Sequence, residues 1–325
     1  MIFNRIEKWI ADLMRRSYIM HRIIFTSSFW WNRTRMKFWY LLFNKIHLFY
    51  TEVVVTTNCS LKCKECYEYV PYLDKVHQRF MSFENYKIYI DNLLSNIDSL
   101  KYLRFLGGEA LLSKDLDKFL QYALEQKKIK KVSLVTNGTI ELSDEIINVL
   151  SKYPKKAMVD ISNYSSNEKL RPRLKEKAII KKCNENNINV IYLDTLEWID
   201  ISKVKYHNRS IKNNEKYYLS CASVCVGIHE WNKEAGEICA GVFPCIKAGI
   251  FKLCDIGNQK ESIDYISLSK PVSKKDFIKF YFNNNFDACQ YCSYLEDRKK
   301  RISPAEQIED GMNVENKLYM EKNNK

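Results

Sequence analysis

The chain has 325 residues, of which 46% are hydrophobic, so it is long enough for one large domain and a smaller one. This composition excludes an intrinsically disordered protein, which could not fill a core. The formal net charge of +13, from 52 Lys and Arg against 39 Asp and Glu, indicates an anionic partner. Charge alone does not choose between nucleic acid, a phosphorylated small molecule and an anionic membrane surface.

The eleven cysteines do not fit a disulfide-stabilised secreted domain. The chain is large, its number of cysteines is odd, and its start lacks the apolar core of a signal peptide. The longest charge-free stretch near the N-terminus is Ile23–Asn32, which is far short of the ~20 apolar residues that span a bilayer. We therefore expect a cytoplasmic protein without a transmembrane helix.

Residues 1–50 form a basic, aromatic-rich segment. Nine positions carry Arg or Lys, against only Glu7 and Asp12, and tryptophans such as Trp30 and Trp31 are frequent. The pattern is typical of an amphipathic helix. Two interpretations stay open: a helical extension that packs on the main domain, and a peripheral membrane anchor whose aromatics enter the headgroup layer while Arg and Lys meet anionic lipid.

From residue 51 the chain alternates strand-like apolar runs with segments of helical period, the pattern of a parallel sheet wrapped by helices. Apolar residues recur at helical spacing over Phe83–Ile97 and Leu116–Leu124, and Ser82, Ser113 and Ser143 are the predicted N-caps. Strands are predicted at Glu52–Thr56, Tyr102–Leu106, Val132–Thr136, Ala157–Ile161 and Asn189–Leu193.

The alternation fades after Asp194, and seven of the eleven cysteines fall between Cys221 and Cys292. Because a loop-rich segment with few apolar runs needs cross-linking by ligands, we expect a second metal-bearing module there. The predicted organisation is a helical extension at 1–50, an α/β core at 51–218, a small cysteine-rich domain at 219–295 and a partly helical tail at 296–325.

Cys59, Cys63 and Cys66 follow the first predicted strand with the spacing C-x3-C-x2-C. They would lie on the loop at the C-terminal end of that strand, where barrel-like α/β enzymes place their chemistry. Thiolates are the natural ligands of iron–sulfur clusters, and a four-iron cluster needs four ligands. Three cysteines leave one iron open for the amino and carboxylate groups of a cofactor, which a closed four-thiolate zinc site could not offer.

These residues resemble the radical S-adenosylmethionine (radical SAM) superfamily, which carries a C-x3-C-x2-C loop after the first strand of a partial (β/α)6 TIM-like barrel. Gly107-Gly108-Glu109, after the second predicted strand, resembles the GGE motif that contacts the methionine amino group in that family. The resemblance implies that a reduced [4Fe–4S] cluster splits S-adenosylmethionine to a 5′-deoxyadenosyl radical, which abstracts a substrate hydrogen. It also implies an electron donor such as flavodoxin or ferredoxin.

The third and fourth predicted strands lead into Asn137 and Ser162, at positions where the family lines its cofactor pocket. The resemblance makes both residues candidate contacts of S-adenosylmethionine, although turn chemistry alone also explains an Asn-Gly pair. The family often has an aromatic residue just before the third cysteine. Here Glu65 stands in that place, with Tyr67 after the cluster, so no adenine contact is assigned.

Cys239, Gly249 and Cys254, followed by a distant Cys289-x2-Cys292, resemble the twitch module, a shortened SPASM domain with the signature C-x9-15-G-x4-C and a later C-x2-C. The resemblance implies one auxiliary [4Fe–4S] cluster on Cys239, Cys254, Cys289 and Cys292. Cys245 is the alternative to Cys239. A structural zinc site would use four cysteines equally well.

Cys221 and Cys225 remain as candidate hydrogen donors to a substrate radical, which an epimerase would require. The main interpretation is a radical SAM oxidoreductase or epimerase that acts on a carbohydrate-like or polyol substrate, either a free small molecule or a phosphate-linked sugar. A radical SAM peptide-modifying enzyme is the alternative within the class. An alternative of another class is a zinc-stabilised nucleic-acid-binding protein. Under the main interpretation, nucleic acid is not an expected partner.

Overall fold

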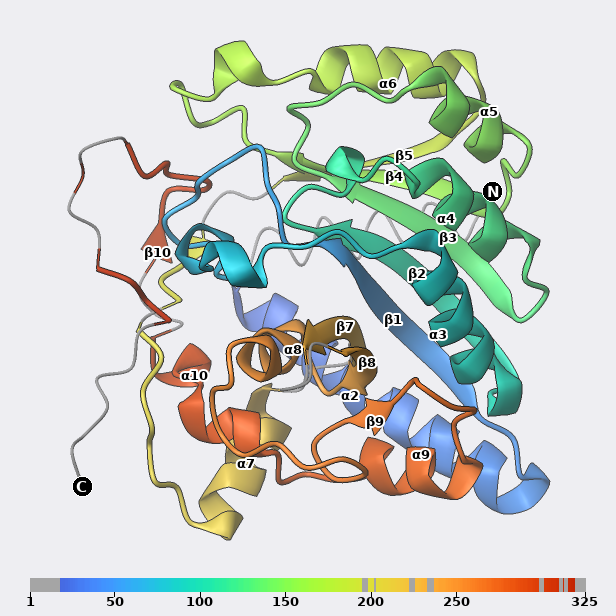
Figure 1. Ribbon diagram of the computed structural model, residues 1–325, viewed down its shortest axis with the longest axis vertical. Helices are drawn as coiled ribbons and strands as arrows, with labels where there is room; N and C mark the ends of the chain where they lie inside the picture. The colour runs from blue at the N-terminus through green and yellow to red at the C-terminus, as the bar shows by residue number, and fades with distance from the viewer. Residues whose placement is uncertain are drawn as a thin grey trace.

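One sheet of eight strands, in the order β5-β4-β3-β2-β1-β7-β8-β9, organises the protein (Figure 1). The computed structural model describes residues 18–194, 198–201, 203–221, 226–232, 237–297, 301–309, 312 and 315–318. Strands β1 to β5 are parallel and neighbours in chain order, so each reaches the next through a crossover connection. They are β1 His47–Thr56, β2 Ser99–Gly107, β3 Ile129–Thr136, β4 Ala157–Asn163 and β5 Asn189–Asp194.

All five predicted strands are present, and each is longer than the apolar run that indicated it. The predicted partial TIM-like α/β architecture is therefore confirmed. A sixth parallel strand does not follow β5 among the described residues. The short strand β6 (Trp198–Ile199) instead pairs with β10 (Arg301–Ile302) in a separate two-stranded sheet.

Helices cover one face of the parallel strands (Figure 1). The hydroxyls of Ser82 and Ser143 cap two of them by accepting the N–H of the residue three positions on, as predicted. Ser113 does not cap a helix: it ends a 3₁₀ turn, and the next helix begins after Asp115. These helices are α3 Phe83–Asn96, α4 Leu116–Glu125, α5 Asp144–Ser151 and α6 Glu176–Glu185.

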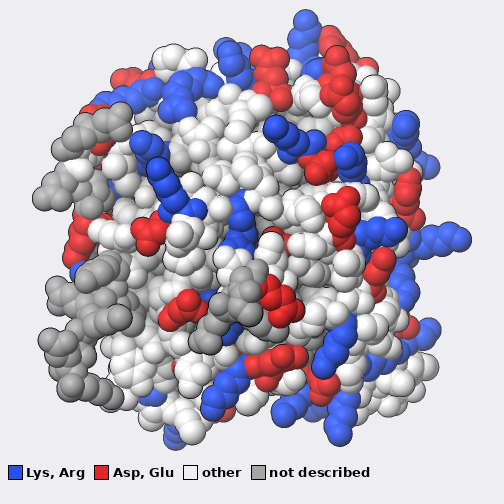
Figure 2. Space-filling view, in the orientation of Figure 1, with Lys and Arg blue, Asp and Glu red and all other residues white. Residues whose placement is uncertain are grey.

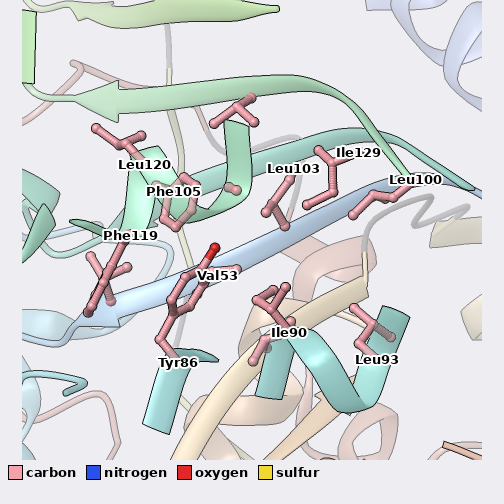
Figure 3. Close-up of a cluster of buried hydrophobic side chains, with 14 of the residues drawn as sticks. Val53, Tyr86, Ile90, Leu93, Leu100, Leu103, Phe105, Phe119, Leu120 and Ile129 are labelled. Carbon is pink, nitrogen blue, oxygen red and sulfur yellow. The ribbon is translucent and has the colours of Figure 1, made fainter. Parts of the chain in front are cut away.

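The main core lies between this helical layer and the sheet. Val53, Leu103 and Phe105 project from β1 and β2 toward the rings of Tyr86 and Phe119 (Figure 3). The two rings stack with centroids 4.7 Å apart. Because side chains alternate along a strand, the next residues along β1 and β2, Glu52 and Arg104 among them, face the opposite side of the sheet. We call that side the barrel interior.

The cysteine-rich segment shares the main sheet. Strand β7 (Val226–Asn232) pairs in parallel with β1, and β8 (Ile238–Phe243) and β9 (Ile266–Ser267) continue antiparallel. The α-helices of this half are α7 Ile211–Cys221, α8 Ile246–Leu253, α9 Lys274–Tyr281 and α10 Tyr294–Asp297. Short 3₁₀ helices lie at Val70–Tyr72, Lys75–His77, Ala110–Leu112, Arg171–Arg173 and Asp287–Tyr291.

The N-terminal segment contains a long helix, α2 (Tyr18–Phe43), that packs on the main domain. Phe29 and Met36 are buried in the core, and the Arg33 guanidinium donates to the carbonyls of Tyr281 and Phe282 at 3.0 and 3.1 Å. The helix thus packs on the main domain, and the membrane contact of this segment stays a prediction. No helix in the described part of the chain is long and apolar enough to cross a membrane.

Candidate cofactor site

The loop that carries Cys59, Cys63 and Cys66 leaves the C-terminal end of β1, as expected. The Thr56 hydroxyl donates to the carbonyl of Arg79 at 2.8 Å, and the Thr57 hydroxyl donates to that of His77 at 2.9 Å. These two bonds tie the start of the loop to the segment that returns toward α3. The backbone leading to the first cysteine is therefore held by the segment at His77 and Arg79.

The three cysteines gather in one small cluster of buried side chains. Leu61 N–H donates to Cys59 Sγ at 3.4 Å, and the Gln307 amide donates to Cys63 Sγ at 3.2 Å. Burial raises the pKa of the Cys59 thiol to about 12 and that of Cys63 to about 11, and it also raises the pKa of Cys66. Thiolates are therefore costly here unless a metal compensates their charge.

This donor set fits an iron–sulfur cluster. Among the described residues, no three His, Cys, Asp or Glu side chains converge as the ligands of one ion would. A [4Fe–4S] cluster does not require such convergence, because each thiolate binds a different iron. N–H groups aimed at the sulfurs of Cys59 and Cys63 suit thiolates bound to a cluster. The three cysteines therefore fit a [4Fe–4S] cluster with one open iron better than they fit a zinc ion.

The two glycines of the Gly-Gly-Glu turn are required by the close approach of the cysteine loop. A Cβ at Gly108 would lie 2.2 Å from the carbonyl oxygen of Asn58 and 2.9 Å from Cys59 Cβ. Gly107 has φ +148°, and a Cβ there would lie 2.2 Å from the oxygen of Thr56. Two backbone bonds join the segments: Gly108 N to Thr56 O at 2.9 Å, and Glu109 N to Asn58 O at 2.8 Å.

Glu109 and Asn137 link the ends of β2 and β3 beneath the cysteine loop. The Glu109 carboxylate is buried and accepts the N–H groups of Leu111 at 3.1 Å and Asn137 at 2.8 Å. Burial raises the pKa of Glu109 to about 7. The Asn137 amide donates to Ser60 Oγ at 3.0 Å and lies 3.6 Å from Cys59 Sγ. The predicted residues Gly107, Gly108, Glu109 and Asn137 are thus brought together with the first cysteine.

Ser162 lies at the end of β4, where its hydroxyl hydrogen-bonds Tyr164. The Tyr164 ring packs beside the three cysteines and meets Trp198 edge to face at 5.7 Å. Ser162 therefore reaches the site through Tyr164. The structure does not place it in contact with a cysteine.

Glu65, which stands where the family often has an aromatic, anchors the cysteine loop to the C-terminal segment. It is buried, accepts the N–H of Ile201 at 3.0 Å and forms an ion pair with Lys317. Lys317 also pairs with Asp200 at 3.1 Å. The nearby Gln307 bridges Lys62 N and Cys63 Sγ, so the C-terminal segment covers the loop.

A second group of cysteines, Cys221, Cys245, Cys289 and Cys292, lines one cavity between α7, α8 and the C-x2-C turn. The cavity encloses about 460 Å³ of space, part of it open to solvent. Burial raises the pKa of Cys245 to about 11 and also raises that of Cys289, and charges on the neighbouring cysteines add to both shifts. Four soft donors around one cavity fit an iron–sulfur cluster as the first group does.

Cys239 and Cys254, expected as ligands beside Cys289 and Cys292, do not line this cavity. Cys239 lies in β8, opposite Trp231 of β7. Cys245 and Cys254 are the caps at the two ends of α8, so the helix separates them by about 13 Å. The structure therefore favours Cys221 and Cys245 over Cys239 and Cys254. Cys225 lies outside the described residues.

Gly249, which suggested the predicted spacing, has a packing role. A Cβ at this position would lie 2.2 Å from the His229 ring. His229 is fully buried, and burial lowers its pKa to about 3. The glycine therefore lets α8 approach β7. Its spacing from the cysteines along the sequence does not indicate which of them bind a cluster.

Arg209 holds the C-x2-C turn and was not singled out in the sequence. Its guanidinium donates to the carbonyls of Cys289 and Cys292, pairs with Glu296, and lies over the Tyr217 ring at 3.9 Å from the centroid. The turn is thus fixed from the side of α7. A lone arginine in a segment without a predicted element gives no pattern that could reveal this role.

Lys247 lies between the two cysteine groups, buried to 2% exposure. Its ammonium group is 4.6 Å from the ring centroid of Tyr67, which follows Cys66, and 3.4 Å from the hydroxyl of Tyr69. No described carboxylate forms an ion pair with it. The positive charge is therefore directed at aromatic faces and at nearby Cys292 and Cys245.

The barrel interior below the cysteine loop is polar. Arg104 forms ion pairs with Asp160 at 3.0 Å and Glu52 at 3.4 Å, and it also bonds Tyr50. Glu68, two residues beyond Cys66, has an oxygen that is buried without a described partner. Burial raises the pKa of Glu68 to about 8, and the charge of Glu52 adds to the shift.

Comparisons with known proteins bear on the first half of this site. Residues 53–197 match the radical SAM superfamily. The GTP 3′,8-cyclase of Aliarcobacter butzleri is 28% identical over 142 residues, which is 42% of this chain and 41% of that protein. The GTP 3′,8-cyclase of Clostridium botulinum is 30% identical over 104 residues, which is 32% of this chain and 31% of that protein. The match thus spans less than half the length of these relatives.

Two solved structures show looser similarity. BtrN in complex with AdoMet and 2-DOIA matches 81% of this chain and 98% of its own, at 15% identity and a TM-score of 0.45. The structure of anSMEcpe with bound AdoMet matches 45% of this chain and 42% of its own, at 18% identity and a TM-score of 0.37. The family match contains Cys59, Cys63, Cys66 and the Gly-Gly-Glu turn in the geometry described above. Residues 53–197 are therefore similar to the radical SAM superfamily, and within them Cys59, Cys63 and Cys66 are the residues that fit a [4Fe–4S] cluster.

Proposed function

We propose that this protein is a radical SAM enzyme that oxidises an alcohol group of a carbohydrate-like or polyol substrate, bound in the barrel interior. Cys59, Cys63 and Cys66 would hold the reduced cluster, whose electron would cleave S-adenosylmethionine to methionine and the 5′-deoxyadenosyl radical that removes a hydrogen atom from the substrate. The protein's own residues then have to hold one carbon in position and exclude water. Their arrangement supports the choice of substrate class.

The buried oxygen of Glu68 carries this proposal. It has no described hydrogen-bond partner, and Asp160, Ser133 and Arg104 also have unpaired buried atoms on the same interior face. Unpaired buried acceptors are costly, and a ligand that brings hydroxyl or ammonium donors relieves the cost. Arg104 is already neutralised by Glu52 and Asp160, so a phosphate group would meet a net acidic surface. A neutral or cationic polyol fits better.

The cavity lined by Cys221, Cys245, Cys289 and Cys292 supports oxidation over epimerisation. A second iron–sulfur cluster held there would supply an acceptor for the second electron that alcohol oxidation releases. Cys221, a candidate hydrogen donor from its sequence, lines this cavity with three other cysteines. That position favours a ligand role for Cys221, which removes one of the two thiols on which epimerisation would depend.

The face shown in Figure 2 gives no support to the nucleic-acid alternative. Basic and acidic side chains are mixed over the face shown in Figure 2. A groove that tracks a nucleic-acid backbone would gather basic residues along one path. The substrate is therefore sought among small molecules.

The test is anaerobic reconstitution followed by iron and sulfide analysis and measurement of 5′-deoxyadenosine. The wild type should hold about eight irons. The Cys59→Ala/Cys63→Ala/Cys66→Ala variant should lose about half of them and all cleavage, whereas Cys245→Ala/Cys292→Ala should lose about half and keep cleavage. Cys183→Ala, a buried thiol of α6, is the matched control and should change neither.

Substrate class is tested by product formation from polyols, aminocyclitols and sugars, with GTP and a cysteine-containing peptide as separate arms. Glu68→Gln should keep its iron and the slow cleavage of S-adenosylmethionine that occurs without substrate. Its rate of product formation should fall by on the order of 100-fold. Glu84→Gln, on the exposed start of α3, is its control. Turnover of GTP or peptide alone, or a fully active Glu68→Gln enzyme, would refute the polyol proposal.

A further inference from the structure

One side of α2 is apolar and exposed along its length. Trp31, Leu41 and Leu42 are 68%, 67% and 62% exposed, and Ile23, Trp30 and Phe38 are about half exposed. These six side chains recur at helical spacing and share one face, which we call the α2 outer face. Exposed apolar patches of this extent on a soluble domain mark interaction surfaces.

The helix cannot turn this face inward. Its opposite side is fixed in the core by Phe29 and Met36, which are 2% and 0% exposed. Arg33 is buried and anchored to the carbonyls of Tyr281 and Phe282. The α2 outer face is therefore a permanent feature of the folded domain and lies parallel to its surface.

The surroundings of the outer face are basic. Residues 18–51 contain five Arg and Lys and no Asp or Glu. Helix α9 runs beside α2, because Lys274 donates to the carbonyl of Asn44 at one end and Arg33 meets Tyr281 at the other. The exposed lysines of the two neighbouring segments are Lys37, Lys45, Lys275 and Lys279.

We infer that the α2 outer face docks the protein on an anionic membrane, with the helix lying flat in the headgroup layer. Tryptophan and phenylalanine favour the interface between headgroups and acyl chains, and leucine adds apolar area. Lysines next to such a face gain from anionic lipid. A second copy of the chain is a poorer occupant, because a symmetric contact would bring the same positive charges together.

Binding of the full-length protein to phosphatidylcholine vesicles, with and without phosphatidylglycerol, tests the inference by flotation. We expect binding to the anionic vesicles. Trp31→Ser/Leu41→Ser/Leu42→Ser should weaken it by roughly tenfold for each side chain. Ile88→Ser/Ile211→Ser, which removes exposed apolar side chains elsewhere, is the matched control and should bind as the wild type does.

Charge is tested separately. Lys37→Gln/Lys45→Gln/Lys275→Gln/Lys279→Gln should weaken binding to anionic vesicles by about fivefold per charge and leave neutral vesicles unaffected. Lys114→Gln/Lys127→Gln/Lys152→Gln/Lys177→Gln, all exposed on the α4–α6 side, is the control of equal charge. Circular dichroism of each variant checks that it folds.

Four outcomes would overturn the inference. The wild type does not float with anionic vesicles, or the control variants lose binding as much as the test variants do. Alternatively, light scattering without lipid shows a dimer that the Trp31/Leu41/Leu42 variant dissolves, which would assign the face to a second copy. Removal of residues 1–17 should leave vesicle binding by the α2 outer face in place; loss of all binding would assign docking to those residues. None of these results depends on iron content or substrate, so they leave the proposed reaction untouched.

Discussion

Replacing Gly108 by alanine should abolish the first cluster while leaving the second in place. The added Cβ would lie 2.2 Å from the Asn58 carbonyl oxygen and 2.9 Å from Cys59 Cβ. Neither neighbour can rotate away, because one is backbone and the other is fixed to it. Relief requires the cysteine loop to move off the end of β2, which breaks the bonds Gly108 N to Thr56 O and Glu109 N to Asn58 O.

The magnitude follows from those losses. Two backbone hydrogen bonds contribute about 1 kcal/mol each, and overpacking adds about 2 kcal/mol. The total of about 4 kcal/mol corresponds to a fall in Tm of about 5 °C for a chain of this length. The displacement of Cys59 from its partners is the larger functional effect, because cluster ligands must keep their positions.

Iron analysis, 5′-deoxyadenosine release and thermal denaturation measure this effect. Gly227→Ala is the matched control, since a Cβ in that strand would meet Ile246 at 3.4 Å, an ordinary contact. The control should keep all iron and cleavage. Wild-type iron content and cleavage in Gly108→Ala would refute the argument that these glycines are set by the approach of the cysteine loop.

Three further predictions concern the other half of the molecule. Arg209→Gln should lose about half of the bound iron but keep cleavage of S-adenosylmethionine, because the C-x2-C turn loses its clamp. Lys247→Met should lower the reduction potential of the second cluster by roughly 40 mV, measured by redox titration with electron paramagnetic resonance, because a buried positive charge is removed from beside it. The depressed pKa of His229, about 3 against 6.5 unfolded, gives stability that is complete above pH 6.5 and is lost as pH falls. Urea unfolding should therefore show a loss of about 1 kcal/mol in the free energy of unfolding between pH 6.5 and pH 5.5, which His229→Leu no longer shows.

The parallel strands could be predicted because their sequences carry local signals. β-Branched runs, helical periods and the caps Ser82 and Ser143 act within a few residues. Ser113 failed as a cap because the chain makes a 3₁₀ turn there before α4 begins, and spacing alone does not distinguish the two turns. Strand β7, which joins the sheet beside β1, could not be found because its pairing depends on contacts distant in sequence.

The first cysteine group could be predicted for a similar reason. Its three ligands share one loop, so their spacing along the chain decides their geometry. In the second group, Cys289, Cys292 and, as the alternative to Cys239, Cys245 were named from the sequence. Cys221 was assigned another role, because the members come from α7, α8 and the turn near Cys289. The predicted pair, Cys239 and Cys254, followed a spacing that includes Gly249. The structure shows that this glycine makes room for the His229 ring, a constraint unrelated to metal binding.

The loop of the first cysteine group also contributes to the wall of the second cysteine cavity. Tyr67 follows Cys66 in the first loop, yet it lines the cavity of the second group together with Cys245 and Lys247. A movement of the first loop therefore changes the wall of the second cavity, and the reverse also holds. Glu68, the next residue, turns toward Glu52 in the barrel interior. Two consecutive side chains of one loop thus face the second cysteine cavity and the proposed substrate site. Under the proposed function, a substrate that bonds Glu68 would lie beside the first cysteine group and close to the second cavity, as an oxidation that removes two electrons requires.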